Sequence, residues 1–419
     1  MARDTGSAEP IPLASIPAEF LTPQGSAPGG EPGADEPGEP RPPTLVWDAP
    51  SLWVERAPVL LANDLHLWAE FGLPFKQVKL RVNNGGPQLL AAVEAGTAHV
   101  GEIGIFPFVQ WRSSVGPGAA GAAVTSAAAT VSAGPHSARI TGTTFIQQLE
   151  HYLVASVARA PEVESIADLA HHTTRGQSTA GAAAEAAGED RRRSVGVLSQ
   201  GSCDSFLLEH ALQAEATSPA AGEGKCDHSA RLSVEVSVVE LREAYGKLSA
   251  LDRADACFLA EPALSAAERA GSARVLKRLG DYFPNGFQWN ALFASDAMLR
   301  AENRPLLLRL MAVYKAAVDR LAEWRDAQRS AAAMASSGPG PAGPTPAVQE
   351  TQAALDAIAS EHFEVSPEVF RSALLRGSEH WALDWRKLDM DGVETCLRTF
   401  RFGRTISADE FSRDFAVAM

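Results

Sequence analysis

Two stretches of this chain decide its fold: GGPQLLAAVEAGTAHVGEIGIFP at residues 85–107 and SVGVLSQGSCDSFLLEHAL at residues 194–212. Each combines a strand-like run with glycines and small polar residues where a helical pattern begins. Gly85 and Gly86 permit unusual backbone angles, and Pro87 suits a first helical turn because its missing N–H would have no partner there. A helix that begins in this way directs free amides towards whatever occupies a neighbouring cleft. Both stretches therefore predict strand and helix units whose loops face a cleft.

Strand-like and helical runs alternate along the chain, which favours α/β layers. The expected strands cover residues 44–47, 78–82, 99–105, 152–156, 194–198, 232–238, 257–261, 274–276 and 288–295. Another strand is expected within the Ala- and Gly-rich run at 116–134, over residues 122–130. Helical spacing predicts a helix over 61–68, a short one over 166–170, a long one from 304 to about 334, and a largely helical region from 348 to 419.

Composition excludes several classes of protein. A chain of 419 residues with 45% hydrophobic content can bury a large core. Its formal net charge of −14, with only one short basic run at 191–193, argues against a nucleic-acid partner. The cysteines show no CxxC pair and no metal-ligand spacing, so reduced thiols and no metal site are expected. No apolar run is long enough to span a bilayer.

The N-terminal residues 1–43 are rich in Pro, Gly and acidic residues, and they lack the basic and apolar regions of a secretory signal. They are predicted to form a disordered tail, and the chain is expected in the cytoplasm. Three tracts of low complexity, at 172–190, 216–225 and 336–346, are interpreted as surface insertions, because such compositions cannot build a packed core.

Several motifs, taken in their order, resemble a known family. They include LLAAVEAGTAHVGEIGIFP, IADLA followed by VGVLSQGSCDSF, ACFLAEPALSAAERAG and GDYFPNGFQWNALFAS. The chain resembles the periplasmic-type solute-binding proteins of the aliphatic-sulfonate, nitrate and taurine group, which also contains the thiamine-pyrimidine-precursor proteins. The resemblance covers about residues 44–393. It implies an α/β, type II periplasmic-binding-protein-like fold, with two lobes, a ligand cleft and two hinge crossings.

The resemblance also implies where the lobes divide. The two crossings fall near 151–154 and near 286–289. Lobe 1 would then contain residues 44–150 and 288–419, and lobe 2 residues 151–287. Hinged closure of two such lobes removes a ligand from water, so a few polar groups can select it strongly.

Ligand contacts are carried over from the resemblance to residues at the loops that face the cleft. The expected contacts are Trp47, Asp48, Ser51, Asn83, Asn84, Gly85, Gly86, Gly104, Phe106, Thr143, Thr144, Gln147, Ser202, Cys203, Asp204, Ser205, Glu261, Gln288 and Trp289.

Each of these residue types also has a plain structural explanation. Trp47 could be a core residue, Ser202 an ordinary helix cap, and Glu261 a favourable charge at a helix start. His66 and His151 are interpreted as structural, because neither a paired carboxylate nor a nucleophile accompanies them. No catalytic residue is therefore expected.

The resemblance implies a non-catalytic protein that binds a small organic anion, a sulfonate or a pyrimidine-like molecule. A membrane permease would be its partner, although no export signal is visible. The alternative is a cytoplasmic enzyme resembling the thiamine-pyrimidine synthases, which use pyridoxal phosphate. Against it, YFPNGFQWNALF at 282–293 lacks that family's cysteine cluster, and GEIGIFPF at 101–108 supplies no lysine. No cofactor is expected outside that alternative, and an interaction module in the helical C-terminal region stays open.

Overall fold

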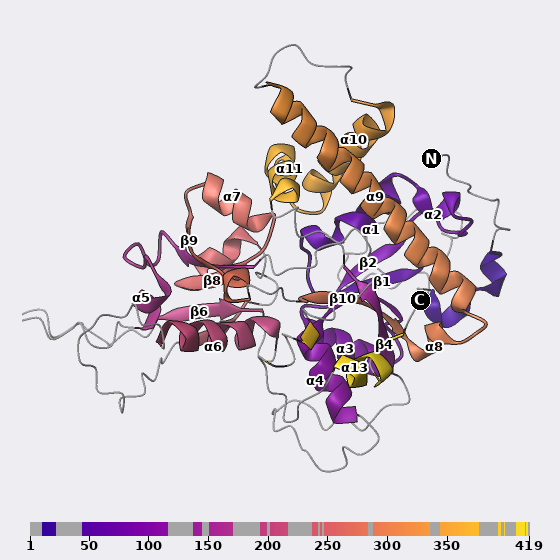
Figure 1. Ribbon diagram of the computed structural model, residues 1–419, viewed down its shortest axis with the longest axis horizontal. Coiled ribbons are helices and arrows are strands. Elements are labelled where there is room, and N and C mark those ends of the chain that lie inside the picture. Colours follow the sequence, from indigo (N-terminus) through magenta and orange to yellow (C-terminus); the bar gives the residue numbers. More distant parts are fainter. Residues whose placement is uncertain are drawn as a thin grey trace, which may run out of the picture.

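The chain forms two five-stranded mixed sheets, which lie side by side in Figure 1. The structure is a computed structural model that describes residues 11–21, 44–115, 137–144, 151–170, 193–198, 202–216, 237–241, 244, 247–283, 288–335, 344–376, 393–394, 398, 408–414 and 416–417. The expected α/β fold with two layered units is confirmed by these two sheets.

The first sheet has the strand order β2-β1-β3-β10-β4. Its strands are β1 (Val46–Ala49), β2 (Lys79–Val82), β3 (Val100–Gly104), β4 (Ala138–Thr143) and β10 (Asn290–Ser295). Strand β1 is parallel to β2 and β3, whereas β10 is antiparallel to both β3 and β4. The carboxyl ends of β1, β3 and β4 therefore meet the amino end of β10 at one edge of the sheet.

The second sheet has the order β7-β6-β8-β5-β9. Its strands are β5 (Tyr152–Ser156), β6 (Ser194–Val197), β7 (Ser237–Glu240), β8 (Ala256–Leu259) and β9 (Ala273–Arg278). Strands β6, β7 and β8 are parallel, and β5 is antiparallel to β8 and β9. Helices α5 (Ile166–Ala170), α6 (Cys203–Ala216) and α7 (Ala263–Arg269) belong to this unit.

Two apolar clusters hold the layers together. One packs the first sheet against α1 (Ala57–Asp64), α2 (Leu67–Glu70), α9 (Arg304–Ala335) and α10 (Pro346–Glu361). The other starts under α3 (Gly86–Glu94) and α4 (Ile105–Val115) and continues without a break into the second sheet. Burial of apolar surface therefore joins the two sheets as well as stabilising each of them.

Glycine is required where β1 and β3 come closest. A side chain at Gly101 would overlap the backbone carbonyl of Asp48, which cannot move without breaking the sheet. The remaining described helices and turns are η1 (Leu13–Ser15), η2 (Ala18–Phe20), η3 (Val54–Arg56), η6 (Leu248–Asp252), η7 (Leu279–Tyr282), α8 (Asp296–Leu299), α11 (Pro367–Leu375) and α13 (Ala408–Asp414).

Most predicted strands occur within two residues of their expected ends, but the structure differs from the prediction at two places. The helix expected over 61–68 is divided, because His66 takes a left-handed conformation with φ 55° between α1 and α2. Strand β4 at Ala138–Thr143 was not expected. The strand expected at 122–130 lies outside the described residues, as do nearly all of the three low-complexity tracts.

The predicted lobe boundaries stay a prediction, because the residues at both proposed crossings are only partly described. Strands up to Thr143 and from Asn290 onwards belong to the first sheet, and strands between Tyr152 and Arg278 to the second. From here on, lobe 1 means the unit built on the first sheet and lobe 2 the unit built on the second sheet, whatever the exact boundaries between them. Helix α11 follows lobe 1 in sequence, yet it packs against α7 of lobe 2.

The prediction that residues 1–43 form a disordered tail is wrong for residues 11–21. This segment forms two 3₁₀ turns, and its Ile16 and Phe20 are buried in the lobe 1 core. The backbone of Leu21 pairs with Leu45, and the Phe20 ring meets the His99 ring edge-on at 4.8 Å. The apolar residues of IPLASIPAEFL are spaced closely enough to cover a core edge, which overall composition concealed.

Among the described residues, no helix combines the length and the apolar character needed to cross a membrane.

We expect Phe20→Ala to lower the free energy of unfolding by about 3 kcal/mol, because it removes a buried ring and leaves a cavity. Urea unfolding followed by circular dichroism measures this change. Leu308→Ala, at a side chain that is 44% exposed, is the control and should cost less than about 0.5 kcal/mol. Equal losses in the two variants would mean that the N-terminal segment does not contribute to the core.

Candidate functional site

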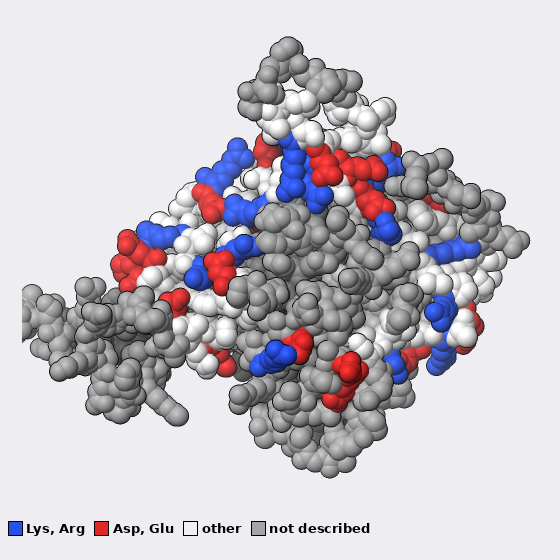
Figure 2. Space-filling view, in the orientation of Figure 1, with Lys and Arg blue, Asp and Glu red and all other residues white. Residues whose placement is uncertain are grey.

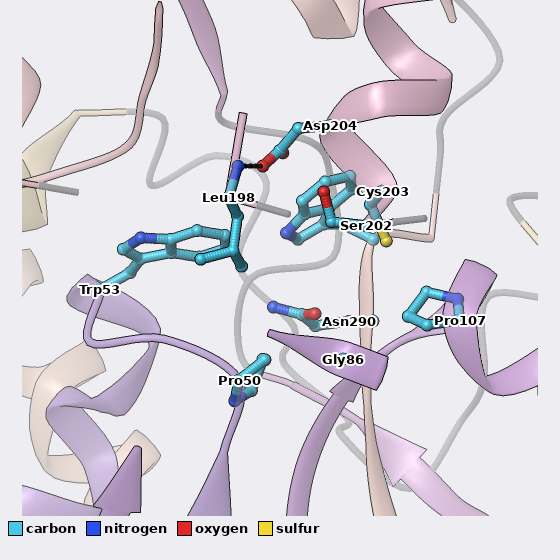
Figure 3. Close-up of a pocket in the computed structure, with 11 residues that line it drawn as sticks. Pro50, Trp53, Gly86, Pro107, Leu198, Ser202, Cys203, Asp204 and Asn290 are labelled. Carbon is cyan, nitrogen blue, oxygen red and sulfur yellow. Dashed lines mark hydrogen bonds between the residues drawn. The ribbon is translucent and has the colours of Figure 1, made fainter. Parts of the chain in front are cut away.

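A pocket lies where the facing edges of the two sheets meet (Figure 3). Lobe 1 and the strand β10 that returns to it contribute Pro50, Trp53, Gly86, Gly104, Pro107, Trp289 and Asn290. Lobe 2 contributes Leu198, Ser202, Cys203 and Asp204, from the end of β6 and the start of α6. The pocket therefore occupies the position at strand ends and helix starts where α/β proteins bind ligands.

The two lobes touch around this pocket. A side-chain carbon at Gly104 would lie 2.8 Å from the Sγ atom of Cys203 in the facing lobe. The Phe106 and Phe206 rings approach to 6.1 Å, and the Val54 amide donates to the Glu261 carbonyl at 3.0 Å. The remaining free space is about 20 Å³, close to what one water molecule needs. The described residues therefore leave no room for an organic ligand in this arrangement.

Aromatic rings form one wall of the pocket. The indoles of Trp53 and Trp289 lie nearly parallel, with centroids 6.3 Å apart. His151 packs against both, at 4.4 Å from Trp53 and 4.3 Å from Trp289. Neither ring nitrogen of His151 has a hydrogen-bond partner. Burial, aided by the charge of Arg56, lowers the pKa of His151 to about 3. Its imidazole is therefore neutral near pH 7 and packs as an aromatic ring.

Ser202 presents a polar group to the pocket that the protein itself leaves unused. Its side chain is 3% exposed, and its Oγ atom has no hydrogen-bond partner. The explanation of Ser202 as an ordinary helix cap therefore fails, because a capping hydroxyl accepts from a helix amide. Asp204 is buried beside it, and its carboxylate accepts from the Leu198 amide at 3.4 Å. A buried hydroxyl without a partner is costly, so a ligand that bonded to Ser202 would recover that cost.

A buried charged cluster lies directly beneath the pocket. The guanidinium of Arg56 pairs with Glu102 of β3, lies 3.4 Å from Glu55, and donates through Nε to the Ser51 carbonyl at 3.0 Å. Asn290, which lines the pocket, donates its amide to Glu55. Burial raises the pKa of Glu102 to about 7, with Arg56 opposing the shift. Burial also raises the pKa of Glu55. One cation therefore balances two carboxyl groups under the pocket floor.

Six of the predicted contact residues line the pocket: Gly86, Gly104, Ser202, Cys203, Asp204 and Trp289. Ser51 and Phe106 are buried close by, but they do not line it, and the Ser51 hydroxyl has no partner. Asn84 and Gly85 form the turn before α3, with positive φ values of 56° and 129°. Ser205 turns back, its hydroxyl donating to the Ser202 carbonyl at 2.8 Å.

The structure gives other predicted contacts different roles. Trp47 lies in the lobe 1 core, stacked on Tyr314 at 5.7 Å. Asp48 and Asn83 belong to a hydrogen-bonded group with Arg81, whose Nε donates to Asp48 at 2.6 Å. These residues fasten β1 to β2, and none of them lines the pocket.

At the predicted crossings the polar residues bind one another. Gln288 donates to the Thr143 hydroxyl at 2.8 Å, and that hydroxyl donates to the Thr144 carbonyl at 3.3 Å. Glu261 accepts from the amide and the hydroxyl of Ser265, at 3.1 and 3.0 Å, and pairs with Arg376 at 2.8 Å. The carboxylate of Glu261 is thus committed to protein partners. Gln147 lies outside the described residues.

Several lining residues were missed from the sequence: Pro50, Trp53, Pro107, Leu198 and Asn290. Pro50 and Trp53 lie in WDAPSLW beside the predicted contacts Asp48 and Ser51. No local pattern in the sequence shows whether Trp47 or Trp53 is the core residue. Asn290 follows the predicted Gln288 and Trp289. Because the strand alternates, only its register on β3 shows which side chain reaches the pocket.

Among the described lining residues there is no lysine, the residue that the enzymatic alternative would need for pyridoxal phosphate. Within the described ranges, no group of three or more His, Cys, Asp or Glu side chains is placed to hold a metal ion.

No protein-family model and no curated protein sequence matches this chain. Solved structures do. A Candida albicans gene product reported to have the generic periplasmic binding protein fold aligns with a TM-score of 0.51 and 10% identity, over 90% of this chain and 97% of that chain. The ligand-binding component of an ABC-type import system from Staphylococcus aureus, solved with zinc bound, aligns with a TM-score of 0.52 and 12% identity, over 89% and 95%.

The alkanesulfonate-binding protein SsuA from Xanthomonas axonopodis pv. citri, bound to MOPS, also matches, with a TM-score of 0.47 and 15% identity over 80% of this chain and 83% of that chain. The protein therefore has the periplasmic-binding-protein fold, and at the level of the fold the resemblance found in the sequence is confirmed. The prediction of a cytoplasmic location is corrected, because a matched structure is the ligand-binding component of an import system, which points away from the cytoplasm.

We expect Glu102→Gln to change how stability depends on pH. A carboxyl group whose pKa is raised by folding stabilises the protein below its unfolded pKa, near 4.5, and loses that contribution as the pH rises through 7. Urea unfolding at pH 5 and pH 8 measures this. The free energy of unfolding of the variant, relative to that of the wild type, should increase as the pH rises towards 7, by on the order of 1 kcal/mol per pH unit. Glu70→Gln, at an exposed site, serves as the control. Parallel curves for wild type and Glu102→Gln would contradict the raised pKa.

Proposed function

We propose that this protein binds a small molecule in the pocket between its lobes and does not transform it. The buried, unpartnered hydroxyl of Ser202 carries the proposal, because it faces the pocket from a helix start and remains unsatisfied until something else bonds to it. Lining residues contributed by both sheets support binding by closure, in which water is excluded from around the ligand.

The lining residues favour binding over catalysis. Cys203 is buried at the pocket, and His151, whose ring packs against two indoles, is neutral near pH 7 because burial lowers its pKa. Nucleophilic catalysis needs a nucleophile and a base within hydrogen-bond reach of each other. No such pair occurs among the described lining residues.

The charge of the site bears on the kind of ligand. No Lys or Arg occurs among the described lining residues, Asp204 lines the pocket, and the Arg56 guanidinium beneath it is already shared by two carboxyl groups. An anion would approach carboxylates without a free cation to balance it. The indoles of Trp53 and Trp289 provide flat apolar surface for a planar ring. A pyrimidine-like ring with amino groups therefore suits these surroundings better than a sulfonate or nitrate.

A membrane permease is proposed as the partner that would receive the ligand. The support is the likeness of the fold to the ligand-binding component of an ABC-type import system. Such a partner would respond to the closed arrangement of the lobes, since closure is what reports an occupied pocket.

We expect 4-amino-2-methylpyrimidine to bind and raise the melting temperature, and taurine, methanesulfonate and nitrate to bind at least tenfold more weakly. Calorimetric titration and thermal unfolding measure both effects, and mass spectrometry after incubation shows whether the compound is consumed. Binding of the anions alone would reject the ligand class while leaving a binding function. If the compound were consumed, the proposal that the protein binds its ligand without transforming it would be rejected.

Ser202→Ala tests the pocket itself. The variant should unfold at the same temperature as the wild type or slightly higher, because it removes an unsatisfied buried hydroxyl. Its affinity for the bound pyrimidine should fall about tenfold. Ser205→Ala is a matched control in the first turn of α6, since that hydroxyl is already bonded to the Ser202 carbonyl. Unchanged affinity in Ser202→Ala would remove this hydroxyl from the site.

Arg376 is expected to hold the closed arrangement. It follows α11, yet it pairs with Glu261 and Glu268 of lobe 2, the latter at 2.6 Å, and its guanidinium lies 5.9 Å from the ring of Tyr152. Arg376→Gln should increase the radius of gyration measured by small-angle X-ray scattering, because the lobes separate more often.

Arg371→Gln is the matched control for Arg376→Gln. Arg371 lies on the same helix, but its partners Asp356 and Glu368 belong to α10 and α11. If both variants scatter as the wild type does, Arg376 has no part in closure.

A further inference from the structure

We propose a second binding site, at the end of the first sheet remote from the interlobe pocket, for a small organic phosphate. A cavity of about 390 Å³ lies there, lined on its polar side by Arg139, Arg300 and Arg304. Its volume falls in the range of about 300–1,000 Å³ that small-molecule sites occupy. Nothing in this proposal depends on the function proposed for the interlobe pocket.

The topology of the sheet separates the two sites. Strand β10 begins with Asn290 at the interlobe pocket and ends with Ser295, which leads into α8. Arg139 lies on β4 opposite Ala294, near that far end of β10. The lining residues Arg300 and Arg304 follow α8 and begin α9. The second cavity is therefore built from different segments at the opposite edge of the sheet.

The side chains of the three arginines have no partner within the part of the chain that the structure describes. No side-chain hydrogen bond or ion pair to Arg139, Arg300 or Arg304 occurs among the described residues, whereas Arg56 and Arg81 are both paired with carboxylates. The chain carries 51 acidic and 37 basic residues, so acidic partners are plentiful. Three unpaired guanidinium groups around one cavity, with Asp296 as the acidic residue of the lining, give this place a local positive charge in a chain whose net charge is −14. Lys and Arg side chains also gather elsewhere on the surface, as Figure 2 shows, so it is the cavity that distinguishes this group.

The start of α9 adds to the positive potential. This helix has 32 residues and no acidic residue in its first turn, and Arg304 is its first residue. The Arg304 amide donates to the Arg300 carbonyl at 3.0 Å, which places the two arginines one turn apart. Cations at the amino end of a helix are repelled by its dipole. Arg300 and Arg304 are both exposed to solvent, and a bound anion would be attracted by their charges as well as by the helix start.

The chemistry of the lining defines the ligand. Guanidinium groups bind phosphate oxygens through paired N–H donors, with a geometry that suits phosphate better than a spherical anion. Leu299, Leu307 and Val417 supply an apolar wall. The Val417 amide donates to the Ile140 carbonyl at 2.9 Å, so this wall is fixed to β4. A phosphate group with an apolar body therefore fits the cavity better than inorganic phosphate.

Phenyl phosphate, inorganic phosphate and phenol test the proposal by calorimetric titration of the full chain. Phenyl phosphate should bind, inorganic phosphate should bind several-fold more weakly, and phenol should not bind measurably. Raising the salt concentration should weaken the binding of phenyl phosphate, because its attraction to arginine is electrostatic. Absence of phenyl phosphate binding at 10 mM, or binding that equals that of phenol, would overturn the proposal.

Substitution locates the binding. Arg300→Gln/Arg304→Gln should reduce the affinity for phenyl phosphate at least tenfold. Lys247→Gln/Arg253→Gln removes the same charge from exposed positions of lobe 2 and should leave that affinity unchanged. Equal losses in the two double variants would indicate a general charge effect and reject the site. Should the first double variant unfold, Arg139→Gln and the salt dependence of the wild type give the same decision.

A lipid phosphate is the competing source of the same chemistry. Vesicles of phosphatidylcholine with 20% phosphatidic acid should not sediment the protein if the cavity takes a soluble phosphate. Sedimentation that is abolished by Arg300→Gln/Arg304→Gln, without any binding of phenyl phosphate, would replace the soluble ligand by a membrane surface and overturn the proposal as stated.

Discussion

The buried guanidinium of Arg56 is the constraint on which the pocket depends. It joins the loop after β1 to Glu102 in the middle of β3, and through Glu55 to Asn290 at the start of β10. Burying charges is costly unless each is paired, so once this network forms, the three strands have little freedom to shift against one another. Trp53 and Asn290 are thereby held at the pocket before any ligand arrives.

The same network explains why the site is not suited to an anion. A buried arginine next to a ligand pocket could bind a sulfonate, but the Arg56 guanidinium is already paired with two carboxyl groups. What remains for a ligand is a set of neutral or acidic groups: the Ser202 hydroxyl, the Asp204 carboxylate and the indole faces. Binding in such a site depends on excluding water, since neutral hydrogen bonds discriminate well only where solvent cannot compete.

Much of the fold was predictable because its strands carry regular apolar patterns and its helices begin at recognisable residues. Ser366, for example, caps α11 through its hydroxyl, and Pro367 follows it. The tail was mispredicted because Ile16 and Phe20 sit among prolines and glycines, so composition outweighed a short apolar pattern. Strand β4 was missed because GTT and ARI give no clear alternation beside a long Ala-rich run.

The site was only partly predictable, for a different reason. The sequence shows which residues lie at strand ends, but it does not show which of their side chains form hydrogen bonds or ion pairs with other parts of the protein. Asp48 and Glu261 were reasonable candidates until their partners Arg81 and Arg376 appeared, and both partners lie far away in the sequence. Ser202 is the reverse case. It became the main candidate because its buried hydroxyl has no hydrogen-bond partner among the described residues, which the sequence does not reveal.

The bridge from α11 to lobe 2 has a kinetic consequence. If the lobes open as proposed, Glu261, which is 3% accessible in this structure, becomes exposed and separates from Arg376. The barrier to release of a ligand would then contain an electrostatic component that dissolved ions lower. A bound molecule would stay longer in dilute buffer than in concentrated salt, so residence time would follow the ionic environment even where contacts with the guest are uncharged.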